Sequence, residues 1–474
     1  MRIRLLALSL GVTVVAASCK DATRPDLNNP SVSDYSNITD LSQVQALSVG
    51  VLIGDRGTIG GEILRGEIIG RDAYNLPVAE PRFVTELLGP SIDPGGFNGT
   101  AGWPYGTIRL ANIGIDGVTQ AAPSVMTDQQ KAATTGFLRT MKALSYLRAI
   151  EMRDTAGAPI NVDVDPTGPL APMSCKGDVL AYTAALLDSA AADLAAGGSA
   201  FPFTLPPGFS GFDTPTTFLL FNRGLAAKTQ VYLAFRDYAP PGGSPGGPID
   251  AAALAAAQTD LNASYMDTTA ASVAALNAGP QHTYSTASGD ATNALFADPT
   301  STDFRANPRV VTEADPGDAR VARKVVKTTN ISLAGVSSDW TFTIYTSPTS
   351  PTPLLSNKEL IFLKAEVEWG MGQLAPALAL ANHIRTVDGG LPAKSVSGAD
   401  NVLNQILYEK RYSLLWETGD RWFDSRMFGK LNGSNPPAGL GLETGNPPLW
   451  NMPIPQPEID ARGGDLTKQS CTVS

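Results

Sequence analysis

A series of long segments whose apolar residues recur with the period of an α-helix sets the strongest constraint on the fold. In residues 129–153, Phe137, Met141, Leu144 and Leu147 fall on one face, a spacing that predicts an amphipathic helix. The same reasoning predicts further helices over residues 42–54, 178–196, 216–238 and 250–265. Because runs of glycine and proline separate the last two helices, we expect them to form a helix hairpin.

The C-terminal half repeats this pattern. A helix is predicted over residues 357–371, and a second helix follows a turn at Gly372, with Pro376 in its first turn. Ala365, Gly372 and Ala377 have the small-residue spacing of a tetratricopeptide hairpin, in which small side chains let two antiparallel helices approach closely. The chain is therefore predicted to be mainly α, a tetratricopeptide-like right-handed helical superhelix.

Long irregular loop insertions and little β-structure complete this prediction. Residues 271–355 are rich in Thr, Ser, Asp, Pro and Gly, with short β-branched runs at 323–327 and 340–345. A long, weakly structured insertion in a helical scaffold usually forms functional surface. The sequence contains no nucleotide-binding glycine motif, nucleophile elbow or metal-ligand helix.

The N-terminus has the pattern of an export signal. Arg2 and Arg4 precede an uncharged, mostly apolar stretch over Leu5–Ala17, and Ser18 leads directly to Cys19. This pattern resembles the lipobox of bacterial lipoproteins, in which the signal is removed before the cysteine and the cysteine carries acyl chains. An ordinary signal peptide with a chance cysteine is the alternative. Lipidation of Cys19 would anchor the chain to a membrane without spanning it.

Composition excludes several classes of protein. The net charge of −10 argues against nucleic-acid binding, which requires clustered Lys and Arg. Only three cysteines and two histidines occur among 474 residues. A disulfide scaffold and a Cys/His zinc site are both disfavoured, and no metal or cofactor is expected.

One C-terminal segment carries a distinctive charge pattern. Residues 406–429 read ILYEKRYSLLWETGDRWFDSRMFG. This resembles the C-terminal signature of the SusD/RagB family of outer-membrane nutrient-binding lipoproteins. The matching positions are Ile406, Glu409, Arg411, Leu414, Glu417, Gly419, Arg421, Asp424 and Arg426. Ser413 and Ser425 depart from the pattern, where Glu and Leu are usual.

Other segments agree with this family in order and spacing. They are Trp103-Pro-Tyr105 with Ile108 and Ala111-Asn112, Lys142-Ala143 through Gly157-Ala158-Pro159, Asn382 with Ile384-Arg385, and Pro453-Ile454-Pro455 with Glu458. The resemblance implies a protein on the cell outer membrane, lipid-anchored and facing the outside. It further implies that the protein caps a TonB-dependent SusC-like transporter and passes it oligosaccharides or peptides without cleaving them.

Five regions follow from these observations. They are a lipoprotein signal peptide at 1–18, a lipid-anchored tether at 19–40, an N-terminal helical region at 41–270, a loop-rich ligand-binding insertion at 271–355, and the C-terminal signature region at 356–474.

The charged residues of the signature could form a structural network of ion pairs or supply catalytic carboxylates. Each acid has an arginine within a few residues, and a carboxylate paired to arginine has a lowered pKa and makes a poor general acid. We therefore expect a structural salt-bridge network of Glu409, Arg411, Glu417, Arg421, Asp424 and Arg426. A hydrolase using paired carboxylates is one alternative, and a tetratricopeptide scaffold that assembles an envelope complex is another.

Exposed aromatic rings are the natural partners of sugar faces, with Asn, Asp and Arg supplying hydrogen bonds. The candidates for ligand contact are Tyr74, Phe97, Asn98, Trp103, Tyr284, Asp339 and Trp340. Trp103 equally fits a helix core. His282 and His383 lie far apart in sequence and are expected to be structural or solvated.

Two cysteines remain once Cys19 is assigned to lipid. Exported proteins favour disulfides, so a Cys175–Cys471 bridge is one possibility. Two unrelated thiols are the other.

Overall fold

Stacked helices make up most of the body. The computed structural model describes residues 36–163, 168–241, 244–431 and 445–464. The α-helices in these ranges are α3 Leu41–Ile69, α4 Arg82–Thr85, α5 Tyr105–Gln120, α6 Asp128–Arg153, α7 Lys176–Ala196, α8 Pro215–Ala234, α9 Ala251–Asn262, α10 Val273–Leu276, α11 Pro308–Thr312, α12 Ala319–Lys324, α13 Asn357–Gly370, α14 Leu374–Val387, α15 Ala399–Leu414, α16 Asp420–Met427 and α17 Gln456–Ala461.

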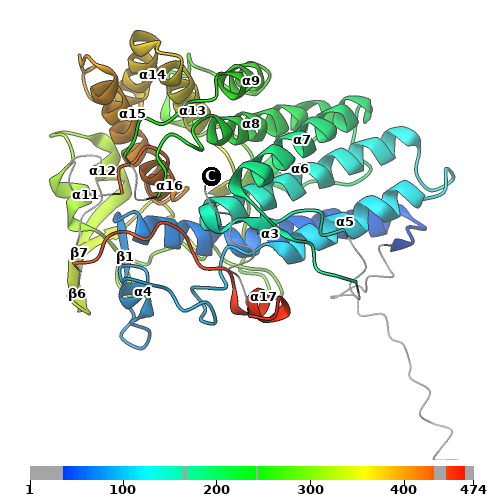
Figure 1. The fold of residues 1–474 in the computed structure, drawn as a ribbon, viewed down its shortest axis with the longest axis horizontal. Coiled ribbons are helices and arrows are strands. Elements are labelled where there is room, and N and C mark those ends of the chain that lie inside the picture. The colour runs from blue at the N-terminus through cyan, green and yellow to red at the C-terminus, as the bar shows by residue number, and fades with distance from the viewer. Residues whose placement is uncertain (1–35, 164–167, 242–243, 432–444, 465–474) are drawn as a thin grey trace, which may run out of the picture.

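Helices that follow one another in sequence pack side by side. Helices α5 to α9 form one stack and α13 to α16 a second, and α3 runs along both, packing against α5, α6 and α16 (Figure 1). Several long helices begin at a side-chain cap, for example Thr127 before α6 and Ser356 before α13. The mainly α, tetratricopeptide-like architecture predicted from the periodicity is confirmed.

The predicted apolar faces lie in the core. Phe137, Met141, Leu144 and Leu147 of α6 are all buried. At the α13–α14 hairpin, Ala365 and Ala377 are buried, and Gly372 makes the turn with φ +76°.

The first helix is longer than predicted. It was expected to end at Gly54 but continues to Ile69, because its second half enters the core and is buried on most sides. Burial on all sides removes the alternation of apolar and polar positions on which a periodicity argument depends.

Strands are short and occur in pairs. The strands are β1 Ala73–Asn75, β2 Ala158–Pro159, β3 Met173–Ser174, β4 Gln281–His282, β5 Phe304–Ala306, β6 Val325–Leu333, β7 Val336–Phe342 and β8 Thr352–Pro353. All pairs are antiparallel: β1 with β5, β2 with β3, β4 with β8, and β6 with β7. The longest pair, β6–β7, is a hairpin in which Leu333 faces Val336.

Among the helices of the described ranges, one has the length and apolar composition of a membrane span. Helix α7 has a mean hydropathy of 1.3 over its most apolar window. Its buried side packs between α6 and α8, so this is weak evidence for a membrane helix.

Cys175 precedes α7 and is disulfide-bonded. Cys19 and Cys471, the other two cysteines, lie outside the described residues. Pairing of Cys175 with Cys471 and lipidation of Cys19 therefore stay predictions.

Candidate functional site

The charged residues of the C-terminal signature lie on α15, on the turn after it and on α16. Each of them is an ion-pair partner, and all but Asp424, which pairs with Lys410, pair with a residue outside this segment. The six are Glu409, Arg411, Glu417, Arg421, Asp424 and Arg426.

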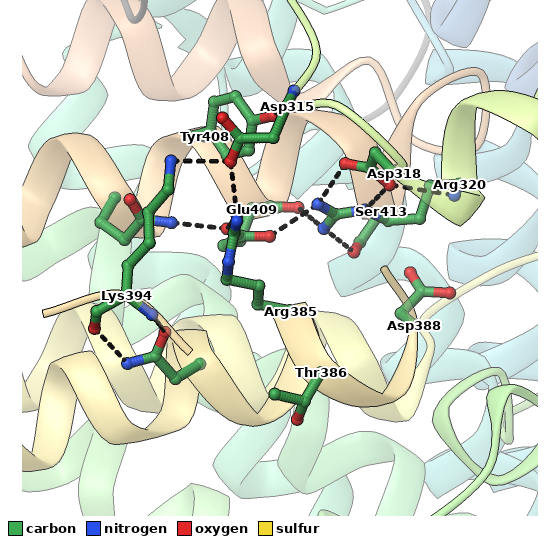
Figure 2. Close-up of polar contacts among 12 residues, drawn as sticks. Asp315, Asp318, Arg320, Arg385, Thr386, Asp388, Lys394, Tyr408, Glu409 and Ser413 are labelled. Carbon is green, nitrogen blue, oxygen red and sulfur yellow. Dashed lines mark hydrogen bonds and ion pairs between the residues drawn. The ribbon is translucent and has the colours of Figure 1, made fainter. Parts of the chain in front are cut away.

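Glu409 is fully buried between two arginines. One carboxylate oxygen lies 2.8 Å from Arg385 Nη1 and the other 2.7 Å from Arg320 Nη2, as Figure 2 shows. Arg320 also donates to Ser413 Oγ at 3.0 Å and pairs with Asp318 at 2.7 Å. Ser413, where the signature usually has Glu, thus accepts a hydrogen bond from the same arginine.

Arg411 and Arg421 converge on one carboxylate, that of Asp72. Arg411 Nη2 lies 2.8 Å from Asp72, and Arg421 pairs with the same oxygen. Arg411 also pairs with Glu313 at 2.7 Å. Asp72 follows α3, so this cluster joins the two ends of the described chain.

Glu417 faces two lysines, Lys324 at 2.8 Å and Lys358 at 2.6 Å. Burial raises the pKa of Glu417, but the attraction of the two ammonium groups outweighs burial and leaves this pKa below its ordinary value. Glu417 is therefore ionised near neutral pH and cannot act as a general acid there.

Asp424 and Arg426 connect α16 to other helices. Asp424 lies 2.8 Å from Lys410, which also contacts Glu366 at 2.9 Å. Burial, only partly offset by Lys410, raises the pKa of Asp424 well above its ordinary value. Arg426 contacts Asp154, at the end of α6, at 3.0 Å.

Two of the expected ligand contacts are buried. Tyr74 is 4% exposed on strand β1, and Asn98 is fully buried, where its amide donates to Glu86 at 2.9 Å. The expectation that both are exposed to a ligand is wrong, because Tyr74 is buried on β1, which pairs with β5, and the buried Asn98 side chain fastens its loop to α4.

Phe97 and Trp103 are half-buried, and cations cover their rings. Arg82 lies 4.7 Å from the Phe97 ring centroid and its side chain is 44% exposed, while the buried Arg65 lies 5.8 Å from the same ring. Arg153 lies 5.3 Å from the Trp103 ring and is fully buried. A ligand can displace the exposed Arg82 from Phe97 more readily than the buried Arg153 from Trp103.

An exposed cation lies over the Trp340 ring, as Arg82 does over the Phe97 ring. Lys327, whose side chain is 68% exposed, lies 5.8 Å from the Trp340 ring and 3.3 Å from Asp339. Tyr284 lies elsewhere, with Arg56 5.7 Å from its ring and its hydroxyl 3.2 Å from Thr352 Oγ1. In the part of the chain that the structure describes, no ring contact joins Phe97, Trp340 and Tyr284.

The lysines that pair with the acids of the signature segment were not identified from the sequence. For one of them, Lys228, the sequence contains an indication. Lys228 lies among apolar residues of α8 and is buried, with Glu151 and Glu359 each 3.0 Å away and Asp420 at 3.4 Å. A charged residue next to the apolar positions of a helix that packs in the core predicts a buried ion pair.

The architecture closely resembles several solved structures. A SusD superfamily protein from Parabacteroides distasonis matches with a TM-score of 0.67 and 14% identity, over 90% of this chain and 98% of that one. The chain has a SusD-like fold. A SusD superfamily protein from Bacteroides fragilis has this fold too, with a TM-score of 0.66 and 16% identity over 90% of this chain and 98% of that one.

A third structure with the SusD-like fold is described as a SusD-like carbohydrate-binding protein from Bacteroides fragilis. Its TM-score is 0.64 at 12% identity, over 90% of this chain and 99% of that one. No family model matches the sequence, and no curated protein matches it either. The SusD-like fold thus persists at sequence identities at which similarity between sequences is faint.

Proposed function

We propose that this chain is a non-catalytic, surface-exposed lipoprotein that captures a glycan and passes it to a TonB-dependent SusC-like outer-membrane transporter. The observation that carries the proposal is the SusD-like fold over 90% of the chain, shared with a solved structure described as carbohydrate-binding. The lipobox pattern ending at Cys19 supports an anchored location. A peptide ligand is the alternative within the same role.

The ion pairs of the signature favour binding over hydrolysis. A glycosidase needs two carboxyl groups free to exchange protons with substrate or water. Glu409 and Glu417 instead lie buried against arginines or lysines.

We further propose that Phe97 and Trp340 contact the ligand. A sugar can stack on each ring by displacing its exposed cation, Arg82 or Lys327, which the solvent then hydrates. Asp339 beside Trp340 offers a carboxylate for hydrogen bonds to sugar hydroxyls.

Titration calorimetry of the mature chain against a panel of neutral oligosaccharides and short peptides tests this role. Trp340→Ala should weaken the binding of the best glycan by at least about tenfold, the value of one lost stacking contact. Lys327→Ala, which uncovers the Trp340 ring and releases the Asp339 carboxylate from its ion pair, should leave binding unchanged or stronger. Binding of peptides alone would favour the peptide alternative.

Two further outcomes would contradict the proposal. Release of reducing ends from a bound glycan, lost in Glu409→Gln, would indicate a hydrolase. Co-purification with an envelope complex that lacks a transporter, together with no ligand in either panel, would indicate a scaffold.

A further inference from the structure

A pocket separate from the Phe97 and Trp340 rings opens on the side of α3. It lies between α3, the short 3₁₀-helix η2 (Pro207–Phe209), strand β4 and the loop that follows β4. Its volume is about 380 Å³, within the range of ligand pockets of about 300–1,000 Å³. Neither the signature cluster nor the proposed aromatic contacts include its lining residues.

One wall of this pocket is apolar. Leu52 and Ile53 come from α3, and Phe209 comes from η2. Leu52 and Phe209 are buried, whereas Ile53 is 51% exposed, so Ile53 is the apolar side chain of this wall that stands open to solvent. Such a wall suits the C–H face of a sugar ring.

The polar part of the lining forms a second wall, with one cation, Arg56 of α3, and one anion, Asp290. Arg56 Nη2 lies 2.5 Å from Asp290 Oδ1, and Arg56 Nη1 donates to the Thr283 carbonyl at 2.9 Å. The Ala291 amide and Arg56 both donate to this carboxylate and hold the pKa of Asp290 below its ordinary value. A guanidinium has five N–H donors, and Arg56 uses two of them here.

The base of this wall is rigid. His282 lines the pocket and is 3% exposed, with Nε2 2.6 Å from Asp55. Burial raises the pKa of Asp55, but Arg148 and His282 outweigh burial and lower it overall. The contact with Asp55 occupies Nε2 and holds the ring of His282 in place. No hydrogen bond occupies Nδ1 within the described residues.

We propose that this pocket binds one or two rings of a neutral sugar, with Arg56, Asp290 and His282 as polar partners. Sugar hydroxyls both donate and accept, so they match a wall that offers Arg56 donors beside the Asp290 acceptor. The two charged residues of the lining have opposite signs, so an anionic ligand would face Asp290 and a cationic one Arg56. This inference rests on the proposed glycan-binding role and adds a second binding position to it.

Two pocket variants and one matched control test the proposal. Ile53→Trp fills the pocket from an exposed position, and Asp290→Asn keeps the shape but removes the anion. Asp193→Asn is the control, because Asp193 also pairs with an arginine, Arg139, at 2.6 Å but on the α6–α7 surface. Circular dichroism checks that each variant is folded.

The probes are maltose, cellobiose, laminaribiose and xylobiose, with glucuronic acid, glucosamine and Ala-Ala as charged comparisons, measured by calorimetry and ligand-observed NMR. At least one neutral disaccharide should bind. Ile53→Trp should abolish this binding, and Asp290→Asn should weaken it by about tenfold or more, the size expected for a lost hydrogen bond to a charged group. Asp193→Asn should bind as the unaltered protein does.

Three results would overturn the proposal. One is the absence of binding by all four disaccharides. Another is disaccharide binding that is lost in Phe97→Ala or Trp340→Ala but kept in both pocket variants. This result would contradict only the pocket and would remain consistent with the proposed function. The third is a result in which only a charged probe binds, no neutral disaccharide binds, and Ile53→Trp abolishes the binding of the charged probe. Failure of the glycan-binding role itself is recognised separately, by the absence of binding to the longer oligosaccharides of the first panel.

Discussion

The carboxylate of Asp72 lies 2.8 Å from the guanidinium of Arg411, although the two residues are 339 positions apart. Arg421 pairs with the same carboxylate. One buried acid just after α3 thus pairs with two buried arginines of the C-terminal signature, and Glu313 is a second acid partner of Arg411. This contact joins the segment after α3 to helices α15 and α16 near the other end of the chain.

Replacement of Asp72 by alanine should strongly destabilise the protein. The variant leaves Arg411 and Arg421 with less compensating charge in a buried site, and breaking a buried pair costs about 3–5 kcal/mol. Urea unfolding followed by tryptophan fluorescence measures the change. Asp237→Ala, at an exposed pair with Arg236, is the control and should change the free energy of unfolding by less than about 1 kcal/mol. Equal effects in the two variants would contradict the structural role of Asp72.

Helix α3 and the turn before α16 approach closely at Gly66 and Gly419, and this contact leaves no room for a side chain at either glycine. A Cβ on Gly66 of α3 would lie 3.0 Å from both Cα and O of Gly419, which itself has φ +75°. Gly419→Ala should therefore destabilise the fold by about 1–2 kcal/mol from backbone strain alone, and Gly66→Val by more. Gly57→Ala, in the same helix with open space around it, should instead stabilise the protein by about 0.5–1 kcal/mol. Thermal unfolding of the three variants compares them.

The stability of the fold should fall as pH rises from 4.5 to 8. Burial, with Asp72 nearby, raises the pKa of Glu67 to about 8. The folded state therefore holds a proton that the unfolded chain releases near pH 4.5, and the stabilisation from that proton is lost as pH rises through the folded pKa. A single group can contribute at most about 1.4 kcal/mol per pH unit.

Glu67→Gln tests this dependence without removing the acceptor that binds the Trp416 amide at 2.8 Å. The glutamine variant should lose less stability than the unaltered protein between pH 5 and pH 8, as measured by urea unfolding at several pH values. An unchanged slope would show that Glu67 does not hold the proton.

Cys19→Ser should release the protein from membranes. If Cys19 carries acyl chains, each buried methylene contributes about 0.8 kcal/mol to membrane binding, so their loss should move the protein into the soluble fraction. Cell fractionation and labelling with a radioactive fatty acid measure this change. Cys175→Ser, at a cysteine that is disulfide-bonded in the fold, should retain the label.

Local features of the structure could be predicted from the sequence. The helix over 129–153 and its buried face follow from spacing alone, because helical hydrogen bonds join residues only four apart. The charge pattern of residues 406–429 singled out a segment whose charged residues lie in buried ion pairs. The extension of α3 to Ile69 was missed, because burial on all sides removes the periodicity.

The partners of the signature were decided only by the tertiary structure. Arg411 pairs with Asp72 and Glu417 with Lys324 because the stacking of helices brings distant segments together. No local rule relates residues tens or hundreds of positions apart. Burial of Tyr74 and the pocket around Arg56 arise in the same way, from strands and loops that meet only in the folded chain. The sequence determined the helices, the export pattern and the charged segment, whereas packing decided which charges pair and which surfaces remain open to a ligand.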